Sequence, residues 1–126
     1  MFNKKLPIKK VVIAGCRDYN NYAQAKKYID YYLSNLRKEY EIIIVSGGAT
    51  GADALGERYA RENGFKIERY PAYWNTYGKS AGPRRNNQMA EVCNYVICFW
   101  DGKSRGTKSM IDCAIKYERP LKIVEI

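Results

Sequence analysis

The chain has 126 residues, of which 46% are hydrophobic and 28% are charged, and its formal net charge at pH 7 is +9. These values indicate one globular domain over residues 1–126 with a basic lead-in over residues 1–9, and they exclude a disordered chain. The sequence has no histidine and its four cysteines lack metal-ligand spacing, so Ser-His and Cys-His catalysis and the common zinc sites are excluded and we expect no metal.

The sequence also predicts where the protein is located and which class of ligand its charge favours. No apolar run approaches the ~20 residues of a membrane span, and no apolar core follows the basic N-terminus. We therefore expect a cytoplasmic protein with no membrane partner. The positive charge favours phosphorylated or polyanionic ligands, but much of it lies in scattered lysine pairs that are typical of solvated surface. Nucleic acid is therefore a weaker expectation than a small anion.

Strands and helices are predicted to alternate from the start of the chain. An apolar run over residues 11–14 predicts a first buried strand, and residues 21–39 have the apolar spacing of a helix. A second strand is predicted over residues 41–45. The following helix is predicted over residues 52–62, because Asn63-Gly64 is a typical helix stop.

The second half of the chain continues this alternation. Its predicted elements are a strand over residues 65–70, a helix over 83–92, a strand over 95–100, a helix over 107–117 and a strand over 121–124. Residues 71–83 show no clear period, and we expect them to form a functional loop. The alternation predicts an α/β fold in which helices cover both faces of a parallel sheet.

A glycine-rich turn follows the second predicted strand over residues 46–53. Its candidate ligand-binding residues are Ser46, Gly47, Gly48, Thr50, Gly51 and Asp53. A turn of this kind at a helix start leaves backbone N–H groups free for an anion, and its glycines allow a ligand close to the backbone. Asp53 has three alternative roles: stabilising the first helical turn, binding a ribose hydroxyl, or orienting Arg17.

Two further turns follow the first and fourth predicted strands. Their candidate residues are Gly15 and Arg17 in the first turn, and Ser104, Arg105, Gly106 and Thr107 in the second. Because the carboxyl ends of parallel strands meet at one edge, we expect these turns to converge with residues 46–53. Arg17 and Arg105 can each direct two N–H donors at a phosphate. The alternative for any single turn is a plain connection, in which Thr50 and Thr107 cap helices.

Residues 82–89 place two arginines and two amides at a predicted helix start. A positively charged arginine at a helix start interacts unfavourably with the helix dipole, and an anionic ligand bound there would offset this cost. We therefore favour a functional role for Arg85 and Asn86 over an exposed polar turn. The preceding loop carries three candidates for stacking on a base, Tyr73, Trp74 and Tyr77. Packing of the loop onto the core explains the tryptophan equally well.

Five segments of the chain together resemble one known family. They are residues 15–19, 46–53, 71–79, 82–89 and 104–107. In this order they resemble the YspA-type, YpsA-related branch of the SLOG superfamily. The resemblance implies a three-layer Rossmann-like sandwich with a mostly parallel five-stranded sheet, and it implies a ligand that is a nucleotide or is derived from one.

Two related families qualify this resemblance. The LOG-type phosphoribohydrolases share Arg85, Met89, Gly106 and Thr107 with the chain. However, Asn86 stands in place of their lysine and Met110 in place of their catalytic glutamate. Their hydrolysis of nucleoside monophosphates is therefore not implied. DNA-processing protein A, which binds single-stranded DNA through a SLOG domain, shares the glycine-rich turn and the Arg85-Asn86 pair.

Three functional hypotheses follow. The first is binding of a nucleotide or ADP-ribose-like ligand at the carboxyl edge of the sheet, with no cofactor required beyond that bound nucleotide. The second is an enzyme that hydrolyses an N-glycosidic or phosphate bond of such a ligand, with Asp53, Glu57 and Asp101 as weak candidates for the general base. The third is single-stranded DNA binding. A second copy of the chain is a further candidate partner, because homo-oligomers are common among the relatives.

Overall fold

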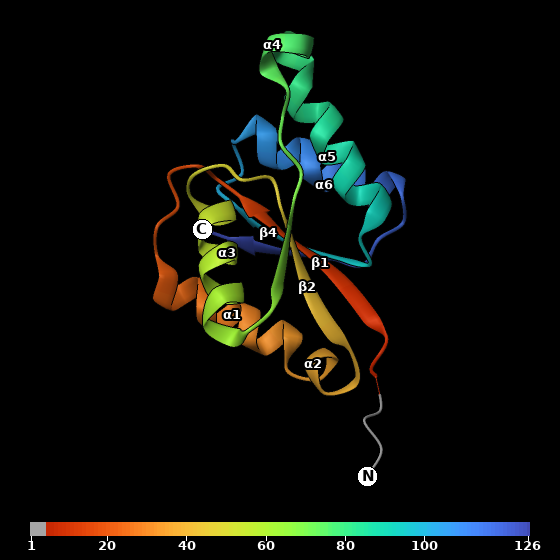
Figure 1. Ribbon diagram of the computed structural model, residues 1–126. Helices are drawn as coiled ribbons and strands as arrows, with labels where there is room; N and C mark the ends of the chain where they lie inside the picture. The colour runs from red at the N-terminus through yellow and green to blue at the C-terminus, as the bar shows by residue number, and fades with distance from the viewer. Residues whose placement is uncertain (1–4) are drawn as a thin grey trace.

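The computed structural model describes residues 5–126 and contains one five-stranded sheet in which all strands pair in parallel. The strand order is β3-β2-β1-β4-β5. The strands are β1 (Ile8–Gly15), β2 (Glu41–Ser46), β3 (Lys66–Arg69), β4 (Tyr95–Trp100) and β5 (Leu121–Glu125). Helices lie on both faces of the sheet (Figure 1). The expected α/β, Rossmann-like sandwich is confirmed, and its sheet is parallel throughout.

Two pairs of long helices cover the sheet. They are α1 (Tyr22–Leu33) and α3 (Ala52–Asn63) on one face, and α5 (Ala81–Val92) and α6 (Arg105–Lys116) on the other (Figure 1). In β1, Val11 and Ile13 join the core under α1 and α3, whereas Val12 and Ala14 join the core under α5 and α6. A strand that is covered on both faces must be apolar at every position, which is why the short apolar runs predict these strands well.

The helix expected over residues 21–39 is interrupted. The first part, α1, ends at Leu33, and a four-residue helix α2 (Leu36–Glu39) follows it. The Ser34 hydroxyl donates to the Tyr31 carbonyl at 3.0 Å, and side-chain bonds of this kind compete with the helical ladder. The apolar spacing continues across the break, so the sequence pattern alone does not reveal it.

The loop expected over residues 71–83 is largely helical, and that prediction was wrong. The segment contains α4 (Trp74–Tyr77) and a 3₁₀ turn η1 (Gly78–Ser80), and α5 already begins at Ala81. Each piece is too short to produce a helical period in the sequence. Pro83 lies in the first turn of α5, where its fixed φ is tolerated.

The strand order fixes where a ligand site is expected. From β1 the chain moves outward to β2 and β3, and it then returns to β4 on the other side of β1. Open parallel sheets bind ligands at the carboxyl ends of the strands where the order reverses in this way. That point lies between β1 and β4, whose following turns carry several of the candidate residues.

Three expectations concern larger parts of the chain. Of the basic lead-in over residues 1–9, residues 1–4 lie outside the described part and the last two already belong to β1. Among residues 5–126, no helix is both long enough and apolar enough to cross a membrane. The same stretch contains no group of three or more cysteine or acidic side chains that fits a metal ion.

Candidate functional site

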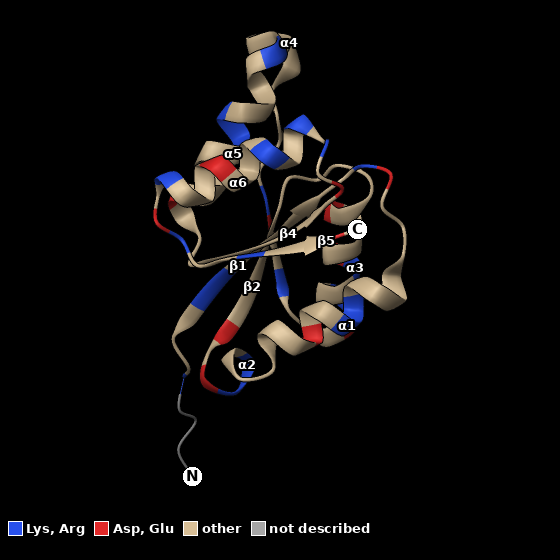
Figure 2. Ribbon diagram, turned by 180° about the vertical axis from the view of Figure 1, so that it is seen from behind, with Lys and Arg blue, Asp and Glu red and all other residues tan. Residues whose placement is uncertain are grey.

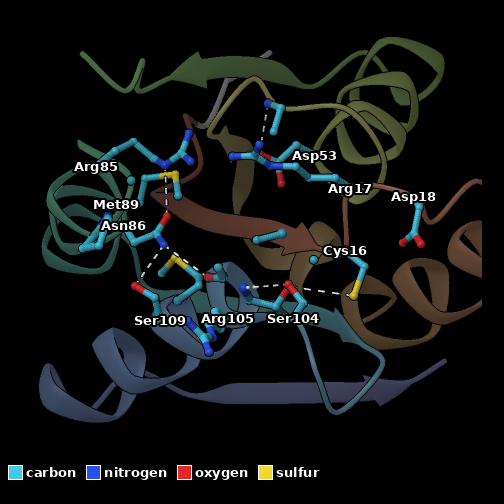
Figure 3. Close-up of a pocket in the computed structure, with 18 of the residues that line it drawn as sticks. Cys16, Arg17, Asp18, Asp53, Arg85, Asn86, Met89, Ser104, Arg105 and Ser109 are labelled. Atoms are coloured by element: carbon cyan, nitrogen blue, oxygen red, sulfur yellow. Dashed lines mark hydrogen bonds between the residues drawn. The ribbon is translucent and has the colours of Figure 1, made fainter. Parts of the chain in front are cut away.

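A cavity of about 570 Å³, called here the first cavity, lies at the carboxyl ends of β1 and β4. The candidate residues that line it are Gly15, Arg17, Asp53, Trp74, Arg85, Asn86, Asp101, Ser104, Arg105, Gly106 and Thr107. Figure 3 shows side chains from the turns after β1 and β4, from α5 and from α6 around this space. The structure therefore brings together residues that lie far apart in the sequence, at the edge where the topology predicts a site.

A second cavity of about 530 Å³ adjoins the first. The glycine-rich turn and the end of β3 supply most of its lining, which includes Gly47, Gly48, Thr50, Arg69, Pro71 and Ala72. The two cavities share four residues, Arg17, Ala49, Trp74 and Arg85. Most of the glycine-rich turn thus faces the second cavity, while Ser46 and Gly51 line neither of the two.

The glycine-rich turn packs directly against the turn that follows β1. The Ala52 N–H donates to the Cys16 carbonyl at 3.1 Å, and the Thr50 hydroxyl donates to the Arg17 carbonyl at 3.2 Å. Gly51 has φ +75°, and a Cβ there would lie 2.3 Å from the Cys16 oxygen, so this position requires glycine. Thr50 joins the two turns, and the N-cap of α3 is Gly51.

Ser46 and Glu57 support the glycine-rich turn from the interior. Glu57 accepts the Ser46 hydroxyl at 2.7 Å, and the Ser46 oxygen accepts the Gly48 N–H at 3.0 Å. Arg69 donates its Nε to Glu57 at 3.1 Å. Burial raises the pKa of Glu57, but the bonds from Arg69 and Ser46 outweigh burial and hold it below its usual value. Glu57 lines neither cavity, so it supports the turn from outside both of them.

Arg85 is 9% exposed and lies in the wall between the two cavities. Its Nη1 donates to the Gly47 carbonyl at 2.7 Å, and its Nε donates to Asn86 Oδ1 at 3.0 Å. The Asn86 amide in turn donates to the Gly106 carbonyl at 3.3 Å and to the Ser109 hydroxyl at 3.2 Å (Figure 3). These bonds tie α5 to the glycine-rich turn and to α6, which gives the two residues a structural purpose that the sequence does not reveal.

Asp53 and Arg85 both approach the backbone of Gly47. A Cβ at Gly47 would lie 2.5 Å from Arg85 Nη1 and 2.9 Å from Asp53 Oδ2. Asp53 accepts the Ala49 N–H at 3.2 Å, and within residues 5–126 no hydrogen bond or ion pair joins it to Arg17. Burial raises the pKa of Asp53 to about 6, while the Ala49 N–H and the charges of Arg85 and Arg17 oppose the rise. Asp53 therefore holds the turn, and its pKa is raised well above the usual value of an aspartate.

The turn after β4 is organised by its own side chains. Asp101 Oδ1 accepts the backbone N–H groups of Lys103 and Ser104, each at 2.8 Å, and these bonds lower the pKa of Asp101. Ser104 caps α6 by accepting the Thr107 N–H at 3.3 Å. The buried Thr107 hydroxyl donates to Ser104 at 3.0 Å, so Thr107 is not the cap. Arg105 begins α6 and is exposed at the mouth of the first cavity.

The three aromatic candidates fall into two groups. Trp74 lines both the first and the second cavity, and the Cζ atom of Arg17 lies 6.0 Å from the centre of its ring. Tyr73 and Tyr77 line a third cavity beside α5, where Arg84 lies 4.3 Å from the centre of the Tyr77 ring. Of the three, Trp74 alone is placed to stack on a ligand in the first two cavities.

The sequence also identifies the family to which this site belongs. The statistical model of the YspA, cpYpsA-related SLOG family, abbreviated YAcAr, matches residues 9–77, which is more than half of the chain. The chain belongs to this family. The match includes the turns after β1 and β2, which border both cavities.

Relatives of this YAcAr chain include one phage protein. The chain is 40% identical over 81 residues to the gene 61 protein of Mycobacterium phage D29, in a match that covers 57% of this chain and 62% of that protein. Two solved structures of DNA processing protein A share the fold over 94% of the chain. The protein from Streptococcus pneumoniae has a TM-score of 0.70 and 22% identity, and the protein from Helicobacter pylori has 0.67 and 23%.

The YAcAr chain spans only part of each of these relatives. It covers 50% of the Streptococcus pneumoniae protein and 65% of the Helicobacter pylori protein. The structure of the Helicobacter pylori protein concerns the single-stranded DNA binding mode of that protein. At 22% and 23% identity, the two likenesses establish the fold of this chain.

One cationic residue of the second cavity was not among the predicted candidates. Arg69, the last residue of β3, lines the second cavity. The sequence does contain a signal for Arg69, because an arginine that ends a parallel strand lies at the same edge of the sheet as the other turns.

Met110 lies in the lining of the first cavity and is 1% exposed. It packs with Met89 in the core and gives the first cavity an apolar floor.

Proposed function

We propose that this protein binds a phosphorylated nucleotide or ADP-ribose-like ligand at the carboxyl edge of its sheet. The observation that carries the proposal is the position of Arg17 and Arg85, which line both cavities beside a glycine-rich backbone turn. Among residues 5–126, neither arginine forms an ion pair with a carboxylate within 4.0 Å. A phosphate would supply the missing negative charge.

The rest of the first cavity fits the other parts of a nucleotide. Met89 and Met110 are apolar and accept a ring, and the exposed face of Trp74 offers a surface for stacking. Arg105 adds a further cationic group to the lining of this cavity, beside Arg17 and Arg85. Small-ligand sites usually combine an apolar lining with a few convergent polar groups in this way.

Calorimetric titration with AMP tests the proposal. We expect AMP to bind the wild-type protein, and Arg17→Ala to weaken binding about tenfold or more, because a hydrogen bond to a charged group contributes about 1.5–3 kcal/mol. Arg17 is exposed, so its removal leaves the fold intact. Lys38→Ala in α2 is the matched control, since it removes one positive charge from an exposed position that lines neither cavity.

Two outcomes of this titration would reject the proposal. One is that neither AMP nor ADP-ribose binds the wild-type protein at millimolar concentration. The other is that Arg17→Ala and Lys38→Ala weaken binding equally, since that would reduce the effect to net charge.

Single-stranded DNA binding is the second candidate function. It is favoured by three exposed aromatic side chains, Tyr73, Trp74 and Tyr77, beside the basic helix start of α5. Exposed aromatic rings next to cationic side chains are the usual platform for single strands. The single-stranded DNA binding mode of the Helicobacter pylori protein, which shares the fold, points the same way.

Hydrolysis of the bound ligand is a further possibility at the same site. The carboxylates that line the first cavity are Asp18, Asp53 and Asp101, whereas Glu57 is held by Ser46 and Arg69 outside it. Asp53 has the raised pKa that suits a general base near neutral pH. Product formation that is lost in Asp53→Asn, with AMP binding retained, would establish an enzyme.

A further inference from the structure

The two cavities are separate spaces that share one wall. Each has a volume of more than 500 Å³, which is enough for a small ligand of its own, because such sites span about 300–1,000 Å³. Their common boundary consists of Arg17, Ala49, Trp74 and Arg85. A mononucleotide held in one of the cavities would therefore leave the other open.

The shared wall concentrates unpaired positive charge. Of the five N–H donors of the Arg85 guanidinium, Nε and one on Nη1 are bound by Asn86 Oδ1 and the Gly47 carbonyl. In the described part of the chain no carboxylate lies within ion-pair distance of Arg85 or Arg17. Burial lowers the pKa of Arg85, which fits a guanidinium that lacks a paired anion. An anionic bridge between the cavities would supply that anion.

The two cavities are lined by different kinds of chemical groups. The first has an apolar floor with Met89 and Met110, together with the amide of Asn86 and the hydroxyl of Ser104. The second is lined by the glycine-rich backbone, by Pro71 and Ala72, and by the guanidinium of Arg69. Each side can thus receive a ring or a sugar through apolar contact and hydrogen bonding, while the shared wall contributes Arg17 and Arg85 to both cavities.

We propose that the site takes a ligand of two nucleoside-sized parts joined by a phosphodiester or pyrophosphate, with the bridging phosphate between Arg17 and Arg85 and one part in each cavity. This inference rests on the proposed nucleotide binding and specifies its ligand class. Trp74, which also borders both cavities, would lie beside the bridge.

Calorimetry with three probes tests the inference. AMP represents one part, ADP-ribose represents two parts joined by a pyrophosphate, and the dinucleotide pApA represents two parts joined by a phosphodiester. In the wild-type protein we expect at least one bridged probe to bind about tenfold tighter than AMP or better, because it gains contacts in the second cavity. The tighter of the two bridged probes identifies the bridge.

A pair of obstructing variants assigns the two cavities. Ala72→Trp places a large side chain in the second cavity, and we expect it to reduce the affinity for the bridged probe to that for AMP while AMP binding is unchanged. Gly106→Leu places one in the first cavity, where a Cβ on Gly106 meets no atom within 4 Å, and we expect it to weaken both probes. Ala23→Trp on the exposed side of α1 is the control for the added indole.

The outcomes separate this inference from the proposed function. Equal affinity of the wild-type protein for AMP and for both bridged probes would overturn the two-part ligand and leave nucleotide binding in place. So would a bridged probe that binds Ala72→Trp and the wild-type protein equally well. Failure of all three probes to bind the wild-type protein would overturn nucleotide binding itself. Tight binding of a longer deoxyadenosine oligomer alone would reassign the site to single-stranded DNA.

Discussion

Asp53 combines two properties that seldom occur together at one side chain. It is 6% exposed and accepts a backbone N–H of the glycine-rich turn, yet no arginine pairs with it at ion-pair distance within residues 5–126. Burial is the largest influence and raises its pKa to about 6. A carboxylate beside the proposed phosphate site would also repel the ligand, and protonation would remove that repulsion.

The titration of Asp53 predicts a pH dependence of stability. Because its pKa is higher in the folded protein than in the unfolded chain, its protonation stabilises the fold as the pH falls through about 6. A difference of about two pKa units between the folded and unfolded states corresponds to ~3 kcal/mol over the whole titration. The range from pH 7 to pH 4 covers most of it, so we expect the unfolding free energy of the wild-type protein to rise by about 2 kcal/mol relative to that of Asp53→Asn.

Urea denaturation of both proteins at several pH values measures this difference. The asparagine keeps an oxygen that can accept the Ala49 N–H, so the comparison isolates the charge. A difference between the two proteins that stays constant from pH 7 to pH 4 would contradict the prediction.

At the scale of elements, the site depends on the close contact between two turns. The backbone of Gly51 lies close to the backbone of Cys16 and Arg17. The carbonyls of these two residues, in the turn after β1, accept hydrogen bonds from the glycine-rich turn. This contact explains why glycine is needed at that position independently of any ligand. The glycine-rich turn is therefore both a part of the fold and a part of the cavity wall.

A pair of glycine substitutions separates conformation from close approach. Gly51→Ala combines a positive φ of +75° with a Cβ placed 2.3 Å from the Cys16 oxygen, whereas Gly64→Ala has a similar φ of +71° and open space. We expect Gly64→Ala to cost about 1 kcal/mol of stability and Gly51→Ala about 3 kcal/mol or more. Thermal denaturation measures both, and equal losses would show that the contact between the turns is unimportant.

How far the sequence predicts these elements depends on their burial. Runs such as residues 11–14 predict strands because strands between two helical layers must be apolar. The convergence of the turns follows from parallel topology alone. The helices of the segment 74–80 are not predictable, because pieces of three and four residues show no period. The structural bonds of Arg85 depend on the distance to Gly47, which lies 38 positions away in the chain and leaves no local signal.

At the scale of the whole molecule, the net charge of +9 has no single focus. In the view of Figure 2, lysine and arginine occur on α2, α5 and α6, with acidic residues among them. Such a surface attracts polyanions weakly and over a wide area. The proposed phosphorylated ligand, in contrast, would meet chiefly the few arginines that line the cavities.

Salt dependence therefore distinguishes the two candidate functions. For single-stranded DNA we expect the logarithm of the binding constant to fall with the logarithm of salt concentration with a slope of about −0.7 per neutralised phosphate, so that several contacts give a steep decline. For AMP the decline should be shallow, because a single phosphate is neutralised. Fluorescence anisotropy with an oligonucleotide and calorimetry with AMP, each at salt concentrations from about 50 to 300 mM, measure the two dependences.

Comparable salt slopes for the two ligands would contradict this distinction. Tyr77→Ala provides the matched variant, because Tyr77 lines the third cavity and neither of the first two. Under the DNA hypothesis it weakens oligonucleotide binding, and under either hypothesis AMP binding stays unchanged.

The reversal of strand order between β1 and β4 also divides the sheet into two halves. β1, β2 and β3 lie on one side and β4 and β5 on the other, while the two hydrophobic cores extend across both halves. The ladder between β1 and β4 joins the halves, and the first cavity takes residues from the turns after both strands. A ligand bound in the first cavity would therefore act as a non-covalent crosslink between the two halves of the sheet, and we expect it to make their unfolding more cooperative.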